Sequence, residues 1–242
     1  MRKLLASVAA AVATLVASAG CSSPDDTTGE PVTVFAAASL NEVFADLAGS
    51  EALDVTYSFD GSSGLVDQIS GGAPADVLAT ADTETMELAV ELGLIDGEPI
   101  SFASNQLTLA VEEGNPLDIA SLDDVDGTRL VVCAPQVPCG RAAQAMGEAQ
   151  DLALSPVSEE NNVSDVAGKV RSGEADTGLV YATTAQDGLE LIEIPEAADH
   201  GVELWIAAVA GTDQPDAARA FIDAVTSPTG TELLEEYGFG LP

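Results

Sequence analysis

The stretch Thr33-Val-Phe-Ala-Ala-Ala-Ser-Leu-Asn-Glu-Val-Phe44 indicates how the 242-residue chain begins its fold. β-Branched and aromatic residues open the stretch and favour a short buried strand at 32–35. Leu40, Val43 and Phe44 then recur at helical spacing, which predicts that a helix follows. Between the two patterns lie only three alanines and Ser39. The sequence therefore predicts a small strand-to-helix turn with one hydroxyl at its tip.

Strands and helices continue to alternate after this turn. Helical periodicity separates four further expected strands, at residues 55–59, 76–80, 129–133 and 177–181. Such alternation is typical of parallel sheets that helices cover on both faces. The predicted fold class is therefore α/β.

The length and pattern of the chain favour two lobes. Two longer apolar strands, 106–111 and 202–210, are expected to cross between them. Lobe 1 would contain residues 32–110 and 211–242, and lobe 2 would contain residues 111–210. Each lobe would be a mostly parallel sheet flanked by helices, and the two final helices would return to lobe 1.

The first 20 residues differ from the rest of the chain. Arg2 and Lys3 precede an apolar run that ends in small residues. This run is shorter than the roughly 20 residues that cross a bilayer, so it predicts a cleaved signal peptide and not a membrane span. We therefore expect residues 1–20 to direct the protein out of the cytoplasm.

Ser18-Ala-Gly-Cys21 is similar to the lipobox of bacterial lipoproteins, in which the cysteine becomes lipid-modified. Ser18 stands where leucine is usual, so ordinary secretion with a free thiol is the alternative. Residues 21–31 are polar and contain Pro and Gly, as expected of a tether between lipid and fold. The protein would then be anchored to the outer face of the cytoplasmic membrane through Cys21 alone.

The chain is strongly acidic, with 41 Asp and Glu against 7 Lys and Arg and a formal charge of −34. Removal of the signal peptide would take away Arg2 and Lys3 and make the charge more negative. Such a chain repels nucleic acids and anionic membrane surfaces, so the composition excludes nucleic-acid binding.

Cys133 and Cys139 lie close together in Val131-Val-Cys-Ala-Pro-Gln-Val-Pro-Cys-Gly140. Close cysteines in an extracytoplasmic protein tend to pair, and the two prolines between them favour a compact turn. We expect a Cys133–Cys139 disulfide, with two free buried thiols as the alternative.

Four expected helix starts combine small residues and hydroxyls, with no cation at the tip. They are Ser39, Asp60-Gly-Ser-Ser-Gly64, Val137-Pro-Cys-Gly140 and Asn161-Asn-Val-Ser164. Free N–H groups at a helix start attract anions, and a hydroxyl adds a neutral donor. Together these turns predict a site for a tetrahedral oxyanion at the carboxyl ends of the strands. Each serine alone has a second interpretation as an N-cap, and Glu42 would complete a capping box with Ser39.

The motifs "VFAAASL", a serine pair followed by "GGAPAD", "VPCG", "GLVY" and "YGF" occur in this order. In order and spacing they resemble the molybdate-binding proteins of bacterial ABC importers. The resemblance implies a two-lobed periplasmic-binding type II fold that closes around its ligand like a hinge. It also implies capture of molybdate, with tungstate as a second ligand, for delivery to an ABC permease. We expect a monomer with no catalytic activity and no cofactor besides the bound oxyanion.

The resemblance also implies the ligand-binding residues. The side-chain donors would be the hydroxyls of Ser39, Ser62 and Tyr181, with Ser63 as the alternative to Ser62. The backbone donors would be the N–H groups of Cys139 and Val163. Tyr181 has a second interpretation as a half-buried core residue.

Asp60 departs from the family pattern. We expect its side chain to point away from the ligand, because a carboxylate in the pocket would repel a dianion. An inward carboxylate could instead accept a proton from hydrogen phosphate, which would weaken the assignment.

Three alternatives remain. Sulfate offers the same charge and the same oxygens as molybdate, so only cavity size can separate them. A secreted serine hydrolase would need a base, and the only histidine, His200, lies in an expected loop. Asp123-Asp-Val-Asp126 could suggest calcium, but it lacks the third acidic position and the closing glutamate of a calcium loop. We therefore expect no catalytic residues and no metal site beyond the bound oxyanion.

Overall fold

The computed structural model describes residues 31–184 and 187–242. The predicted signal peptide, Cys21 and nearly all of the tether lie outside these residues. Within the described part, no helix combines the length and the apolar character that crossing a membrane requires.

Lobe 1 is built on a five-stranded sheet with strand order β2-β1-β3-β10-β4. The strands are β1 (Val32–Ala37), β2 (Val55–Asp60), β3 (Val77–Thr80), β4 (Ile95–Asn105) and β10 (Val202–Val209). β1 pairs in parallel with β2 and β3, whereas β10 is antiparallel to both β3 and β4. All strands except β10 therefore run in the same direction.

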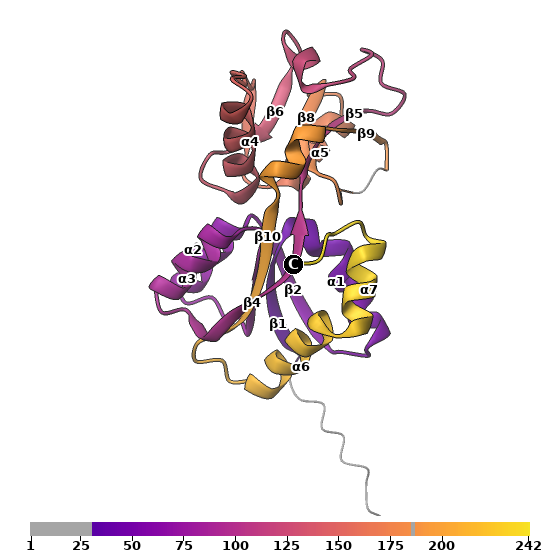
Figure 1. Ribbon diagram of the computed structural model, residues 1–242. Coiled ribbons are helices and arrows are strands. Elements are labelled where there is room, and N and C mark those ends of the chain that lie inside the picture. The colour runs from indigo at the N-terminus through magenta and orange to yellow at the C-terminus, as the bar shows by residue number, and fades with distance from the viewer. Residues whose placement is uncertain (1–30, 185–186) are drawn as a thin grey trace, which may run out of the picture.

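Helices cover both faces of this sheet. They are η1 (Ala38–Leu40), α1 (Asn41–Ser50), α2 (Ser62–Ser70), α3 (Thr83–Glu91), α6 (Pro215–Thr226) and α7 (Pro228–Glu236). Figure 1 shows α2 and α3 on one side of the sheet and α1 and α7 on the other. The two C-terminal helices thus pack in lobe 1, against α1, β1 and β10.

Lobe 2 repeats this plan with strand order β7-β6-β8-β5-β9. Its elements are β5 (Leu107–Glu112), η2 (Leu122–Val125), β6 (Leu130–Cys133), α4 (Pro138–Ala149), β7 (Ser158–Glu160), α5 (Val163–Arg171), β8 (Thr177–Tyr181), β9 (Leu189–Glu193) and η3 (Pro195–His200). β5 is antiparallel to β8 and β9, and β6 is parallel to β7 and β8. The prediction of two mostly parallel α/β lobes is confirmed.

The chain crosses between the lobes at two adjacent places. β4 continues through Gln106 into β5, and the segment 194–201 leads from β9 back to β10. Asn105 at the end of β4 is paired with Val202 at the start of β10, so the crossings lie side by side. The sheets therefore change near 106 and before 202, whereas the sequence placed the boundaries at 110/111 and 210/211. The difference arises because β10 pairs with β3 and β4, and apolar character does not reveal a strand's partners.

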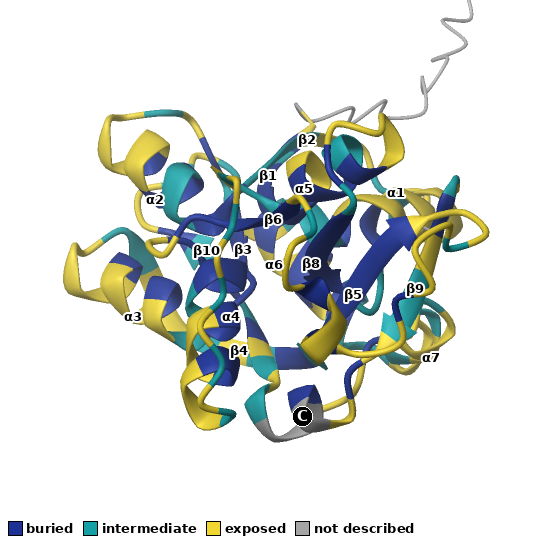
Figure 2. Ribbon diagram, turned by 90° about the horizontal axis from the view of Figure 1, so that it is seen from above, coloured by how far each residue is buried: buried dark blue, intermediate teal, exposed yellow. Residues whose placement is uncertain are grey.

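An aromatic cluster forms the centre of lobe 1. Phe44 of α1 meets Phe221 of α6 edge-to-face at 5.3 Å between ring centroids, and it also packs near Tyr57 and Phe102. The Tyr57 hydroxyl donates to the Phe44 carbonyl at 2.7 Å, so its polar end is satisfied. In Figure 2 the strands are largely buried and exposed residues lie on the outer helix faces. The helix predicted from Leu40, Val43 and Phe44 therefore anchors the core beside the first strand.

Replacing Phe44 by alanine should lower the free energy of unfolding by about 3–5 kcal/mol, because a fully buried ring leaves a cavity. Urea denaturation followed by circular dichroism measures this loss. Leu117, which is 53% exposed, offers a control, and Leu117→Ala should change the stability by less than about 0.5 kcal/mol. Equal losses in the two variants would contradict the role of the aromatic cluster.

Candidate ligand-binding site between the lobes

A cavity lies between the lobes, where β1, β2 and β8 end and α2, α4 and α5 begin. Its lining consists mainly of small and polar residues: Ala37, Ala38, Ser39, Asp60, Gly61, Ser62, Ala81, Pro138, Cys139, Asn161, Asn162, Val163 and Tyr181. The space open to the centre of a water molecule is about 20 Å³. One water needs about 10–15 Å³ on this scale, so the space in this arrangement of the lobes is small and suits a compact guest.

Ser39 lies in the single turn η1 that joins β1 to α1. Its hydroxyl oxygen is buried and has no hydrogen-bond partner among the described residues. The capping-box interpretation with Glu42 is therefore wrong, because α1 begins later, at Asn41, and its N-cap is Leu40. A buried hydroxyl without a partner costs about 1–3 kcal/mol, so Ser39 is suited to donate to a guest.

The serine pair is divided between two roles. Ser62 lines the cavity and its Oγ accepts the Ala81 N–H at 3.0 Å, which leaves the Ser62 proton available to donate. The Ser63 hydroxyl donates to the Gln136 carbonyl at 2.8 Å, across the boundary between the lobes. Of the two alternatives, the structure places Ser62 at the cavity and Ser63 outside its lining.

Cys139 is the second residue of α4, after Pro138. The next two N–H groups, of Gly140 and Arg141, both donate to the Val137 carbonyl. The Cys139 N–H precedes them and has no acceptor within its own helix. Cys139 also forms a disulfide with Cys133 at the end of β6, with 5.6 Å between their Cα atoms. The disulfide therefore fixes this helix start to the sheet of lobe 2.

Val163 is the first residue of α5, and its N–H likewise has no acceptor in the helix. The N-cap of α5 is Asn162, whose side chain accepts the Asp165 N–H at 2.9 Å. Because the Asn162 side chain accepts the Asp165 N–H and not the Val163 N–H, the Val163 N–H remains available at the cavity.

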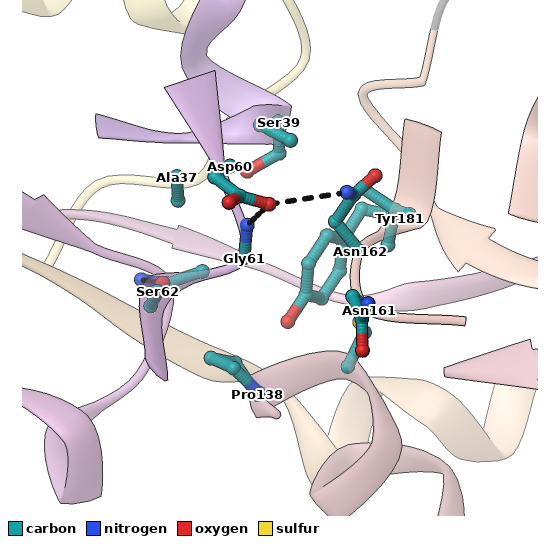
Figure 3. Close-up of a pocket in the computed structure, with 13 residues that line it drawn as sticks. Ala37, Ser39, Asp60, Gly61, Ser62, Pro138, Asn161, Asn162 and Tyr181 are labelled. Atoms are coloured by element: carbon teal, nitrogen blue, oxygen red, sulfur yellow. Dashed lines mark hydrogen bonds between the residues drawn. The ribbon is translucent and has the colours of Figure 1, made fainter. Parts of the chain in front are cut away.

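Tyr181 ends β8 and is almost completely buried. Its hydroxyl is the second cavity group without a hydrogen-bond partner among the described residues. Burial raises the pKa of this phenol, and the charge of Asp82 raises it further while Arg141 opposes the change. Tyr181 therefore stays protonated as a donor. Figure 3 shows its hydroxyl turned into the space bordered by Ser62 and Pro138.

Asp60 was expected to point away from the site, but it lines the cavity. β2 ends at this residue, and its Oδ1 accepts the Gly61 N–H at 2.7 Å and the Asn162 side-chain amide at 3.5 Å (Figure 3). Its Oδ2 accepts from Gln68 at 3.4 Å. The carboxylate is therefore held inward by protein donors, one of which comes from the opposite lobe.

The lobes meet closely beside Asp60. A Cβ atom added to Gly61 would lie 2.2 Å from the Asn161 carbonyl oxygen of lobe 2. No real Cβ tolerates such a distance, so a glycine at this position is required for the closed arrangement.

The lining contains donors but, among the described residues, neither a lysine nor an arginine. It also contains no histidine, and His200 at the end of η3 does not reach the cavity serines to form a Ser-His pair there. In the described ranges no group of three or more His, Cys, Asp or Glu could hold a metal ion. Asp124 of the acidic run instead forms a capping box with Ser121. The arrangement can bind a small guest that carries several acceptor oxygens.

The sequence analysis identified five of the residues that line the cavity: Ser39, Ser62, Cys139, Val163 and Tyr181. It placed Gly61 in one of the turns of the predicted site, but it did not identify Ala81 as a lining residue. Ala81 comes directly after a buried strand. This position at the carboxyl end of a strand was the available signal that Ala81 lies at the site. The close contact of Gly61 could not be predicted locally, because the Asn161 carbonyl belongs to the other lobe.

A family model described as bacterial extracellular solute-binding protein matches residues 32–240. The chain belongs to this family. The molybdate-binding protein ModA of Mycobacterium tuberculosis is 40% identical over an alignment that covers 96% of this chain and 94% of the relative. The family consists of binding proteins, which agrees with a cavity built from donors.

Solved structures share the fold at lower sequence identity. The periplasmic molybdate-binding protein of Azotobacter vinelandii superposes with a TM-score of 0.73 at 21% identity, covering 87% of this chain and 99% of that one. The sulfate-binding protein SubI of Mycobacterium tuberculosis superposes with a TM-score of 0.69 at 19% identity, covering 86% of each chain. The fold alone therefore does not decide between the two oxyanions.

All three tyrosines of the chain should resist ionisation in the folded protein. Burial raises the pKa of Tyr57 and Tyr181, and a hydrogen bond to Asp46 raises the pKa of Tyr237 to about 12. Tyrosinate absorbance of the native protein should stay low at pH ~10, where the denatured protein is half ionised. Native titration near pH ~10 would contradict the described environments.

The same shifts set the sign of the alkaline stability change. Each folded pKa is raised above the unfolded value, so the stabilisation is complete below about pH 10 and is lost as the pH rises through the folded values. Urea denaturation at increasing alkaline pH should therefore show decreasing stability.

Proposed function

We propose that the protein captures molybdate outside the cytoplasm and delivers it to an ABC permease. The observation that carries this proposal is the pair of buried hydroxyls, of Ser39 and Tyr181, that lack partners at one cavity. Membership of the solute-binding family and the identity with a molybdate-binding relative support it.

A tetrahedral dianion matches the donors of this cavity. Three helix starts, of α2, α4 and α5, bring partial positive charge to it, and three hydroxyls add directional hydrogen bonds. The donors converge from both lobes, so the ligand is contacted fully only when the lobes are closed. The negative net charge of the chain opposes binding only weakly, because salt screens distant charges while these local dipoles act at contact distance.

Asp60 is the one carboxylate among the described lining residues, and its charge disfavours a dianion. Gly61, Asn162 and Gln68 donate to this carboxylate and offset part of its charge. Tungstate has the same charge and shape as molybdate and is expected to bind as well. Sulfate offers the same charge and the same number of oxygens, so the size of the cavity around the ligand decides between sulfate and molybdate.

The finer assignments are part of this proposal. Residues 1–20 act as a signal peptide, and Cys21 carries the lipid that anchors the protein to the outer face of the cytoplasmic membrane. The protein acts as a monomer without catalysis, and the oxyanion is its ligand and not a resident cofactor.

Calorimetric competition among molybdate, tungstate, sulfate and phosphate tests the proposal. Molybdate and tungstate should bind most tightly, and molybdate at 100 times its Kd should stabilise the fold by about 2.7 kcal/mol. A preference for sulfate would replace the ligand while keeping the site. If millimolar molybdate produces no binding heat and does not shift the melting temperature, the proposal is refuted.

Ser39→Ala and Tyr181→Phe should each weaken molybdate binding by about 1–3 kcal/mol, because each removes a hydrogen bond to a charged ligand. Titration calorimetry gives the Kd values. Ser101 on β4 provides a matched control, since its hydroxyl is also buried without a partner but does not line the cavity. Ser101→Ala should leave the Kd unchanged, and unchanged Kd values in all three variants would remove Ser39 and Tyr181 from the site.

A further inference from the structure

Arg141 stands beside the cavity without lining it. It lies in the first turn of α4, two residues after Cys139. Its side chain leaves lobe 2 and reaches α3 of lobe 1, where Nε donates to Asp82 Oδ2 at 2.8 Å. Nη2 donates to the same carboxylate and to Thr85 Oγ1, the latter at 2.6 Å. Arg141 thus joins the two lobes through a forked ion pair.

The acceptor of this ion pair is rigidly placed. Asp82 is the N-cap of α3, and its other oxygen, Oδ1, accepts the Thr85 N–H at 3.0 Å. Its backbone carbonyl accepts the Thr80 hydroxyl at 3.0 Å. The preceding residue, Ala81, donates to Ser62. The ion pair is therefore connected on one side to Ser62 and on the other to Cys139, which are ligand donors in the proposed function.

A second crossing contact reinforces the first. Arg141 Nη1 donates to the Gln136 carbonyl at 2.6 Å, and Ser63 of lobe 1 donates to the same oxygen. Arg141 also approaches Glu84 at 3.3 Å at the solvent side. The side chains of Arg141 and Asp82 are only 23% and 11% exposed, so solvent screens their interaction weakly.

We propose that Arg141 is a positioning residue that locks the closed lobes through Asp82 and thereby sets the affinity for the bound oxyanion. This inference rests on the proposed function. The ion pair needs groups from both lobes, so its free energy belongs to the closed form and adds to ligand binding, which selects that form. A planar guanidinium suits this role because it reaches Asp82, Thr85 and Gln136 at the same time.

Arg129 provides a matched control. It forms an ion pair with Asp176, and both residues belong to lobe 2. Arg129→Ala removes the same charge and an ion pair within lobe 2, which is more exposed than that of Arg141, without separating the lobes. Asp82→Asn tests the other partner, because asparagine keeps the N-cap while losing the charge.

The Kd for molybdate, measured by titration calorimetry on the mature protein, should rise about 10- to 100-fold in Arg141→Ala and in Asp82→Asn. Arg141→Lys should fall between Arg141→Ala and the wild type, because it keeps the charge but loses the fork. The double variant should bind no worse than either single variant, as expected of one shared interaction. Arg129→Ala should bind like the wild type. An unchanged Kd in Arg141→Ala, or additive losses in the double variant, would overturn the inference.

Small-angle X-ray scattering of the ligand-free proteins separates this inference from the proposed function. The wild type and Arg129→Ala should share one radius of gyration, and Arg141→Ala should have a larger one because its closed form lacks the ion pair. Equal values for all three would overturn the lock, whether or not the wild type binds molybdate. A wild type that binds no molybdate while Arg141→Ala expands would refute only the proposed function.

Discussion

Two hydroxyls and two amide groups at the cavity have no acceptors among the described residues, and this deficit governs the energetics of the site. Ser39 and Tyr181 bury their hydroxyls without partners, and the Cys139 and Val163 amides have no acceptors in their helices. Buried donors without acceptors destabilise the closed form, and a guest with several oxygens reverses this cost. In the ligand-free protein these groups oppose closure and the Arg141–Asp82 ion pair favours it, whereas around an oxyanion both support closure. Specificity and closure have one physical origin.

The fold places these donors at the cavity by repeating one unit, a strand that ends where a helix begins. Each contributing turn follows a strand end, and each brings a helix start to the gap between the lobes. The small side chains of Ala37, Ala38 and Ala81 leave the backbone accessible to the cavity. Gly61 allows the Asn161 carbonyl to come close. A larger side chain at any of these places would occupy the guest's space or hold the lobes apart.

Much of this was predictable, because it rests on local patterns. The strands near Val32–Ala37 and Thr177–Tyr181 and the helices that follow or precede them have strong periodicity. β4, β7 and β9 were not predicted. β4 contains Gly97 and Pro99 and lacks alternation, and β7 has only three residues, all polar. These segments become strands through pairing with neighbours that the local sequence does not specify.

Parts of the site were beyond local patterns for the same reason. The choice between Ser62 and Ser63 depends on which hydroxyl faces lobe 2 and which faces the cavity. Asp60 turns inward because a donor from Asn162 comes from the opposite lobe. Arg141 finds its acceptor 59 residues away in the sequence. Each of these features depends on how the lobes meet.

The two chain crossings, placed next to each other where Asn105 pairs with Val202, also determine how the lobes move. A single connection would let one body swivel freely around it. Two connections side by side form a hinge, which allows the lobes to rotate about the line that joins the connections and resists sliding and twisting. Opening and closing therefore follow nearly one degree of freedom, and each cycle brings the same surfaces back into register.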